Sequence, residues 1–149
     1  MLVQFLLGSE SDKPHAEKMT KILDEWNVQH DVKVASAHKV PEKVLDIVTN
    51  LNASTEPVVY ITIAGRSNGL SGVTAANAVH PVIACPPFSG KNDVMLNVGS
   101  SLMMPSDTPA IVVVDPQNAA MAAIRILALT DKDLAGKVKE HIKTVKSKF

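Results

Sequence analysis

The sequence predicts an α/β domain with a central parallel sheet of about five strands. Short β-rich runs alternate along the chain with segments of helical period, which is typical of a parallel sheet covered by helices. One run, residues 57–64, is almost continuously apolar, as expected for a central strand that is buried on both faces. At 149 residues, of which 46% are hydrophobic and 20% charged, the chain fits one domain with one core.

In the first half of the chain, predicted strands run into polar loops and then into helices. Residues 2–7 are apolar apart from Gln4, and residues 28–35 carry Val or His at every second position; both patterns predict strands. The helices that follow begin near Pro14 and Pro41, because proline fits the first helical turn, where its missing N–H needs no partner. The first helix has one apolar stripe, formed by Ala16, Met19, Ile22, Leu23 and Trp26.

The second half continues this alternation. Further strands are expected at residues 81–85 and 110–114, with helices over 71–78, 93–102 and 118–129. The last stretch, about residues 131–148, is rich in lysine and predicts a C-terminal helix. Its apolar stripe at helical spacing must be buried, and we expect it to pack on a neighbouring subunit. The stripe consists of Leu134, Val138, His141, Ile142 and Val145.

Charge and composition exclude several classes of function. Lysine plus arginine and aspartate plus glutamate number 15 each, so no overall field favours nucleic acid or an acidic membrane as a partner. No apolar run approaches the roughly 20 residues that cross a bilayer. The single cysteine, Cys85, cannot form an internal disulfide, and the apolar opening is too short for a signal sequence. We therefore expect a cytoplasmic protein.

Three polar loops follow predicted parallel strands, at the edge where open α/β sheets bind ligands. After the first strand, Ser9, Ser11 and Asp12 lie beside a helix N-terminus and offer hydroxyl and N–H groups to a phosphate. Asp12 can also accept hydrogen bonds from ribose hydroxyls, or it can merely cap the helix. The sequence contains neither a Walker A motif nor G-x-G-x-x-G, so ATP and NAD are poor candidates.

The loop after the second strand holds His38, between Ser36 and Lys39. A titratable base, a hydroxyl and a cation thus lie close together, which favours acid–base chemistry beside an anion. The alternative is a surface histidine at the start of a helix. The other histidines do not pair with a second ligand at metal-binding spacing, so we predict no metal site.

Arg66 and Cys85 also lie at or near the ends of predicted strands. Arg66 stands in a glycine-bounded loop after the most apolar strand, where an unpaired charge would be costly, so we expect it to meet a carboxylate, for example from a neighbouring subunit. Cys85 precedes Pro86 and has no histidine beside it in the sequence. It is therefore expected to be a small buried hydrophobe and not a nucleophile.

These loops resemble those of a known family. Residues 8–12 read Gly-Ser-Glu-Ser-Asp, residues 36–39 read Ser-Ala-His-Lys, and residues 64–70 read Ala-Gly-Arg-Ser-Asn-Gly-Leu. In this order and spacing they resemble the PurE family, and the resemblance extends over nearly the whole chain. It implies a single catalytic domain over residues 1–149 with a flavodoxin-like three-layer fold. It also implies a homo-oligomer, octamer or tetramer, with active sites between subunits.

The resemblance also distinguishes two branches of this family. One branch is a mutase that moves a carboxylate within N5-carboxyaminoimidazole ribonucleotide, and it carries an arginine and a second histidine where this chain has Lys39 and Gly69. The other branch, class II PurE, joins carbon dioxide directly to aminoimidazole ribonucleotide in purine biosynthesis. Lys39 and Gly69 favour this carboxylase, which needs no ATP, biotin or metal.

The resemblance assigns roles to individual residues. It implies that Ser9 and Asp12 bind the phosphoribosyl group, that Ser36 and Lys39 recognise phosphate or carboxylate, and that His38 transfers a proton at the ring carbon. We expect backbone N–H groups around Ser67, Asn68 and Gly69 to hold the new carboxylate. The expected catalytic residues are His38 and Lys39, and the expected substrate-binding residues are Ser9, Asp12, Ser36, Lys39, Arg66, Ser67, Asn68 and Gly69.

Two alternatives remain open from the sequence. The first is the mutase of the same fold, which would use the N-carboxylated substrate without bicarbonate. The second is a noncatalytic flavodoxin-like nucleotide-binding module, which would turn over neither substrate.

Overall fold

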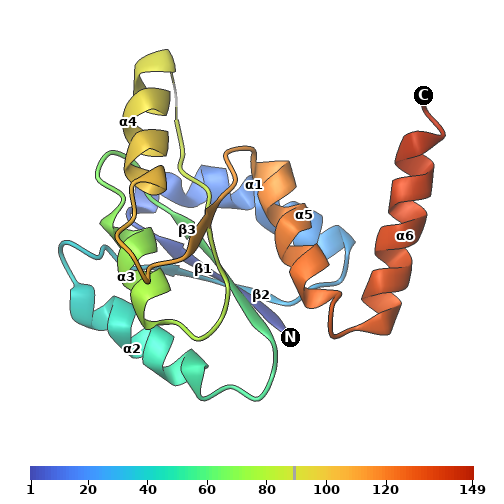
Figure 1. Cartoon of the computed structure of the whole chain (residues 1–149), viewed down its shortest axis with the longest axis horizontal. Coiled ribbons are helices and arrows are strands. Elements are labelled where there is room, and N and C mark those ends of the chain that lie inside the picture. Colours follow the sequence, from blue (N-terminus) through green and yellow to red (C-terminus); the bar gives the residue numbers. More distant parts are fainter. Residues whose placement is uncertain (89) are drawn as a thin grey trace.

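A computed structural model, which describes residues 1–88 and 90–149, is a three-layer α/β sandwich (Figure 1). Its strands in the described ranges form one sheet of order β2-β1-β3-β4-β5, in which every pairing is parallel. This order is that of flavodoxin-like folds, so the predicted fold class is confirmed. The strands are β1 (Leu2–Leu7), β2 (His30–Val34), β3 (Val58–Ile63), β4 (Val82–Ala84) and β5 (Ala110–Val112).

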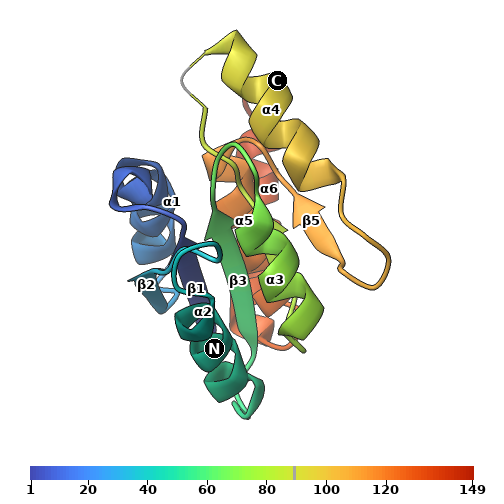
Figure 2. The same cartoon turned by 90° about the vertical axis from the view of Figure 1, so that its left-hand side faces the viewer.

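The helices cover both faces of the sheet. They are α1 (Lys13–Glu25), which follows a short 3-10 turn η1 (Glu10–Asp12), α2 (Pro41–Asn52), α3 (Gly69–Asn77), α4 (Lys91–Leu102), α5 (Pro116–Leu127) and α6 (Lys132–Lys146). Side chains of α1, α5 and α6 share one buried cluster, and those of α2 and α3 share another on the opposite face. Strand β1 supplies both clusters, because Phe5 and Leu6 point to opposite faces. Helix α4 contacts β5 and projects from the sandwich (Figures 1 and 2).

Several boundaries differ from the sequence-based expectation for local reasons. Helix α3 begins two residues early, at Gly69, because the Asn68 side chain accepts a hydrogen bond from the Ser71 N–H. Helix α5 begins at Pro116, two residues before the expected start, because Asp115 caps it in the same way. Strand β2 excludes Val28, whose N–H instead donates to Leu23 O at the end of α1.

Helix α6 lies beside α5 at one side of the molecule (Figure 1). Leu134 and Val138 of its apolar stripe are buried in the chain's own core, and Ile142 packs against the same cluster. Val145, one turn further, is 40% exposed. The first half of the stripe is therefore buried within the chain itself, while packing of this helix on a neighbouring subunit stays a prediction.

No helix in the described part of the chain is long and apolar enough to cross a membrane.

Candidate active site

A cavity of about 710 Å³ lies at the carboxyl ends of the strands, as expected for an open α/β sheet. Loops that follow β1, β2, β3 and β4 form its walls. Most of the predicted site residues line it: Ser9, Asp12, Ser36, His38, Lys39, Arg66 and Ser67. The structure thus brings together three segments that are far apart in the sequence, and it places Asn68 and Gly69 outside the lining.

The loop after β1 is held by its own side chains. The Ser9 N–H donates to Asp12 Oδ2 at 3.0 Å, and Ser9 Oγ accepts from the Ser11 N–H at 3.3 Å and from the Ser11 hydroxyl at 2.9 Å. Partial burial raises the pKa of the Asp12 carboxyl, and the hydrogen bond from Ser9 opposes that rise. Asp12 makes no side-chain cap to α1; it closes the turn η1 instead.

The loop after β2 places its base and its cation in the open. Ser36 O accepts the N–H groups of Lys39 and Val40, at 3.2 and 2.9 Å, and this turn leads into α2. The side chains of His38 and Lys39 are exposed at the mouth of the cavity. They are therefore accessible to a ligand.

The imidazole of His38 rests on the first residue of α3. A Cβ atom added to Gly69 would lie 2.9 Å from both Cε1 and Nε2 of His38, closer than carbon atoms approach without displacement. The ring therefore occupies the space that any side chain at position 69 would need. The contact joins the loop after β2 to the start of α3, directly after the loop that follows β3.

The loop after β3 is held from outside by α4. The Arg66 N–H donates to Asn97 Oδ1, and Arg66 O accepts from the Ser100 hydroxyl at 2.5 Å. Arg66 has a φ of 60°, in the left-handed region that non-glycine residues rarely adopt. The Arg66 side chain is exposed, so the free-energy cost of burying an unpaired charge does not arise. No carboxylate of the described residues lies within ion-pair distance of its guanidinium.

Asn68 has a structural role beneath the cavity. It is 4% exposed. Its Nδ2 donates to Ser101 Oγ at 2.8 Å, and its Oδ1 accepts from the N–H and hydroxyl of Ser71. The Asn68 side chain thus fixes the start of α3, and the assignment of Asn68 to substrate binding stays a prediction.

The backbone N–H groups of this loop are only partly available. The Asn68 N–H donates to Ser100 Oγ at 3.2 Å, and the Gly69 N–H donates to Ser67 O at 3.0 Å. In this structure both N–H groups therefore have acceptors within the protein, and their binding of a carboxylate stays a prediction. Among the described residues, the Ser67 N–H has no acceptor, so it is the one of the three that can meet a ligand.

The loop after β4 was missed as part of the site. The cavity is lined by Pro87 and Phe88 of this loop and by Asp93 and Asn97 of α4, which follows it. The available signal was topological, because this loop also follows the carboxyl end of a parallel strand. Its composition, with two prolines and no histidine, does not itself indicate a binding site.

Cys85 lies behind this wall and is fully buried. Its Sγ is 3.5 Å from His15 Nε2, a contact that the sequence did not indicate. Burial, and then the charge of Asp115, raises the pKa of the thiol to about 12, while burial and then Lys18 lower the pKa of His15. Both groups are neutral near pH 7, so the thiol is not activated as a nucleophile.

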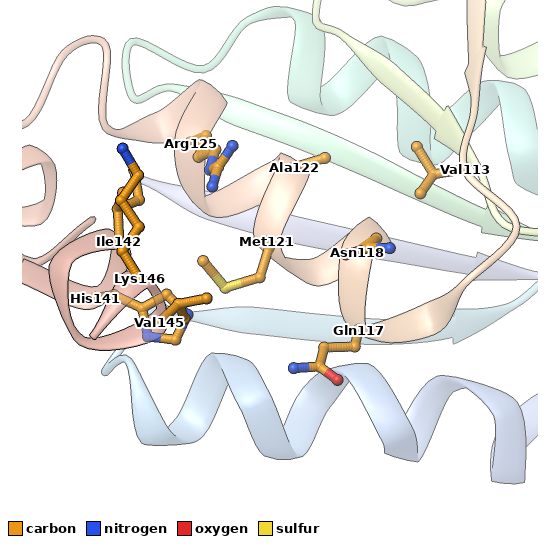
Figure 3. A pocket seen from close by; sticks show the side chains of 10 residues that line it. All are labelled: Val113, Gln117, Asn118, Met121, Ala122, Arg125, His141, Ile142, Val145 and Lys146. Carbon is orange, nitrogen blue, oxygen red and sulfur yellow. The ribbon is translucent and has the colours of Figure 1, made fainter. Parts of the chain in front are cut away.

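A second cavity, of about 650 Å³, lies between α5 and α6 (Figure 3). Met121 and Ala122 of α5 face Ile142 and Val145 of α6, and none of the predicted site residues lines it. It is separate from the four-loop cavity. In the described part of the chain, no three His, Cys, Asp or Glu side chains come together as a metal site would require.

Comparison with known proteins identifies relatives along the full chain. A phosphoribosylaminoimidazole carboxylase of Treponema denticola is 40% identical over 147 residues, which cover 96% of this chain and 89% of the relative. An N5-carboxyaminoimidazole ribonucleotide mutase of Methanocaldococcus jannaschii is 42% identical over 149 residues, 99% of this chain and 92% of the relative. The crystal structure of Treponema denticola PurE superimposes with a TM-score of 0.91 at 40% identity, covering 99% and 92% of the two chains.

The family model described as AIR carboxylase matches residues 2–148. That match spans all the strands and all four loops of the cavity. The chain therefore belongs to the AIR carboxylase family.

Proposed function

We propose that this protein carboxylates aminoimidazole ribonucleotide with carbon dioxide, giving 4-carboxyaminoimidazole ribonucleotide in purine biosynthesis. The observation that carries the proposal is the packing of His38, which lines the four-loop cavity, on Gly69 at the start of α3. A family branch with a histidine at position 69 could not keep His38 in this place. Relatives named phosphoribosylaminoimidazole carboxylase support the same activity.

The nucleotide would lie across the loops after β1 and β2. The hydroxyls of Ser9 and Ser36 and the ammonium of Lys39 suit a phosphate, and all three residues line the cavity. Asp12 Oδ1 has no partner among the described residues and can accept from a ribose hydroxyl. In this arrangement the aminoimidazole ring reaches the junction of His38 and Gly69.

The chemistry requires one bond to form and one proton to leave. The ring carbon beside the exocyclic amine is enamine-like and attacks the carbon of carbon dioxide, whose π electrons move to an oxygen. The intermediate still holds its ring proton. Neutral His38 removes that proton as a general base, the C–H electrons restore the aromatic ring, and the proton leaves to solvent, to which the exposed His38 is open.

The new carboxylate would be held by groups of the loop after β3. The Ser67 N–H is unengaged among the described residues, and the exposed guanidinium of Arg66 lies on the same wall. Lys39 adds positive charge from the opposite loop. Fixed N–H dipoles and cations stabilise a developing carboxylate more strongly than mobile water does.

The reaction would proceed without ATP, biotin or a metal. The exocyclic amine of the substrate already makes the ring carbon nucleophilic, so carbon dioxide needs no prior activation. The residues required are then a base, anion-binding groups and a pocket, and the four loops contain each of these.

We also propose a cytoplasmic homo-oligomer, octamer or tetramer. Two observations support association: Met95 and Leu96 on α4 and Met103 directly after it are 79%, 64% and 83% exposed, and half of the residues that line the α5–α6 cavity are apolar (Figure 3). Exposed apolar surface of this kind is typical of subunit contacts. Sedimentation equilibrium tests the proposal, and a monomer at micromolar concentration would contradict it.

A second candidate is the mutase. The relative from Methanocaldococcus jannaschii carries that name at 42% identity, so overall similarity does not separate the two activities. Lys39 and Gly69 are the residues that favour the carboxylase.

The test is ultraviolet-monitored turnover of two substrates in parallel. Aminoimidazole ribonucleotide is supplied with bicarbonate, and fresh N5-carboxyaminoimidazole ribonucleotide is supplied in buffer depleted of carbon dioxide. Rapid use of the first alone is expected. Rapid use of the second would establish a mutase, and use of neither would favour a binding module.

A further inference from the structure

Asn97, on the inner side of α4, joins two walls of the cavity. Its side chain is buried, with 6% of the residue exposed. Oδ1 accepts from the Arg66 N–H in the loop after β3, and Nδ2 donates to Pro87 O in the loop after β4, at 2.5 Å. Both ends of the amide are therefore used within the protein, although Asn97 lines the cavity.

The same amide covers Gly65. A Cβ atom added there would lie 3.0 Å from Asn97 Nδ2 and 3.4 Å from its Cγ. Gly65 thus allows α4 to approach the backbone of the loop, and Asn97 fills the space that a side chain would take.

Ser100, one turn further along α4, completes the support. It donates to Arg66 O and accepts from the Asn68 N–H. The N–H and C=O of Arg66 are therefore both held from α4, where Arg66 keeps its left-handed φ of 60°. A non-glycine residue stays in that region only when its surroundings impose it.

Ser67 lies between these two fixed residues. Because Arg66 and Asn68 are both bound to α4, the peptide of Ser67 has little freedom to turn, and its N–H stays without an acceptor among the described residues. Loss of the bond from the Arg66 N–H to Asn97 would release the start of the loop. The Ser67 N–H, which belongs to the same peptide as Arg66 O, would then be directed by the bond from Ser100 alone.

We propose that Asn97 is a positioning residue, which acts through Arg66 to hold the Ser67 N–H and the Arg66 side chain toward the carboxylate formed in the reaction. This inference rests on the proposed function for its chemical consequence. Its structural part, the fixing of Arg66 by Asn97, is testable without turnover.

The first test is kinetic. In Asn97→Ala, kcat with aminoimidazole ribonucleotide and saturating bicarbonate is expected to fall by about 10- to 100-fold, because misplacement of a positioning loop by about 1 Å has effects of this order. KM for the nucleotide should change by less than about threefold, since the loop after β1 is held by its own bonds. A wild-type kcat would overturn the inference.

Asn52 provides a matched control. Its side chain also bridges two segments with both ends of its amide, donating to Asn77 O at 2.8 Å and accepting from the Val79 N–H at 3.0 Å. It lies at the end of α2, at the opposite edge of the sheet from the cavity. Asn52→Ala should lower stability to a similar extent and leave kcat and KM unchanged. Equal losses of kcat in both variants would show a merely structural role.

The second test separates the two bonds of the amide. Asn97→Asp keeps the acceptor for Arg66 but sets a carboxylate oxygen against Pro87 O. Protonation of the introduced carboxyl restores a donor, so the ratio of its kcat to that of the wild type should rise as the pH falls toward about 6. Asn52→Asp should show no such rise in kcat. A ratio for Asn97→Asp that does not depend on pH would contradict the inference.

The third test does not need activity. Amide hydrogen exchange at Arg66 should be slow in the wild type, in Asn97→Asp and in Asn52→Ala, and at least about tenfold faster in Asn97→Ala. Unchanged exchange in Asn97→Ala would overturn the inference even if the enzyme works. If the wild type turns over no substrate while Arg66 exchange responds as expected, the proposed function fails and the structural part of the inference stands.

Discussion

The loops after β1 and β3 face the same cavity but are held in opposite ways. In the first, Ser9 bonds to residues two and three positions further along the chain. In the second, Arg66 bonds to residues 31 and 34 positions away, on α4. The first loop is therefore self-contained, whereas the second depends on the packing of a distant helix.

This difference matters because α4 is the helix that projects from the sandwich (Figure 2). Its outer side chains Met95 and Leu96 are largely exposed, while its inner side chains Asn97 and Ser100 hold the loop after β3. Any contact that moves α4 would reach the loop after β3 and leave the loop after β1 in place. In the proposed arrangement, nucleotide binding and carboxylation would thus depend on separate parts of the structure.

The largest effect is expected from His38→Asn, which removes the proposed general base from the cavity that both loops line. We expect kcat to fall by about 10²- to 10⁴-fold, as is typical of the loss of a general base. KM for the nucleotide should change little, because the groups assigned to phosphate and ribose remain. Steady-state kinetics over a range of pH checks this, and full turnover by the variant would remove His38 from proton transfer.

The next largest effect is expected from a methyl group added at Gly69, directly after the loop that follows β3. Gly69→Ala places a Cβ 2.9 Å from the His38 ring and must displace it, so kcat should fall by about 100-fold. Gly8→Ala is the matched change in the first loop. Its Cβ meets Ala64 Cβ at 3.3 Å, a contact that a small shift relieves, and a loss of kcat below about tenfold is expected. Equal losses would mean that the His38–Gly69 contact has no special role.

Stability should show the same contrast on a smaller scale. Ser100→Ala removes two hydrogen bonds between α4 and the loop after β3, and we expect the free energy of unfolding to fall by about 1–2 kcal/mol. Ser11→Ala removes one hydrogen bond within an exposed loop, from the Ser11 hydroxyl to Ser9 Oγ, and should cost less than about 0.5 kcal/mol. Urea unfolding at constant pH measures both, and a larger loss for Ser11→Ala would reverse the comparison.

The smallest effect concerns the charge of the first loop. Partial burial raises the pKa of Asp12, so its ionised form is less stable in the folded than in the unfolded protein. The neutral form carries no such penalty. Asp12→Asn, which keeps an acceptor for the Ser9 N–H, should therefore be slightly more stable than the wild type near pH 7, by less than about 0.5 kcal/mol after solvent screening.

This gain should disappear as the pH falls through the raised pKa of Asp12 and then below the ordinary value of an aspartate, where both proteins are uncharged at this position. Thermal unfolding of the two proteins across this pH range provides the measurement. A stability difference that grows toward low pH would contradict the assigned direction of the shift.

The same contrast explains how much of the molecule the sequence predicts. The alternation of apolar runs and helical periods predicted the parallel sheet, and the polar loops after its strands predicted most of the cavity, because both signals are local. Asn97 and Ser100 carry no local signal, since their partner Arg66 lies more than 30 residues away. The structural role of the Asn68 side chain has no local signal for the same reason, because its partner Ser101 is on α4.

The fate of ¹³C-labelled bicarbonate supplied with aminoimidazole ribonucleotide is the most direct measurement of the proposed activity. Carbon-13 NMR of the product should show the label in a carboxylate on the ring carbon, formed by the wild-type protein without ATP, biotin or added metal. Absence of label in the product, together with conversion of N5-carboxyaminoimidazole ribonucleotide that retains its own carboxylate, would contradict the carboxylase and establish the mutase.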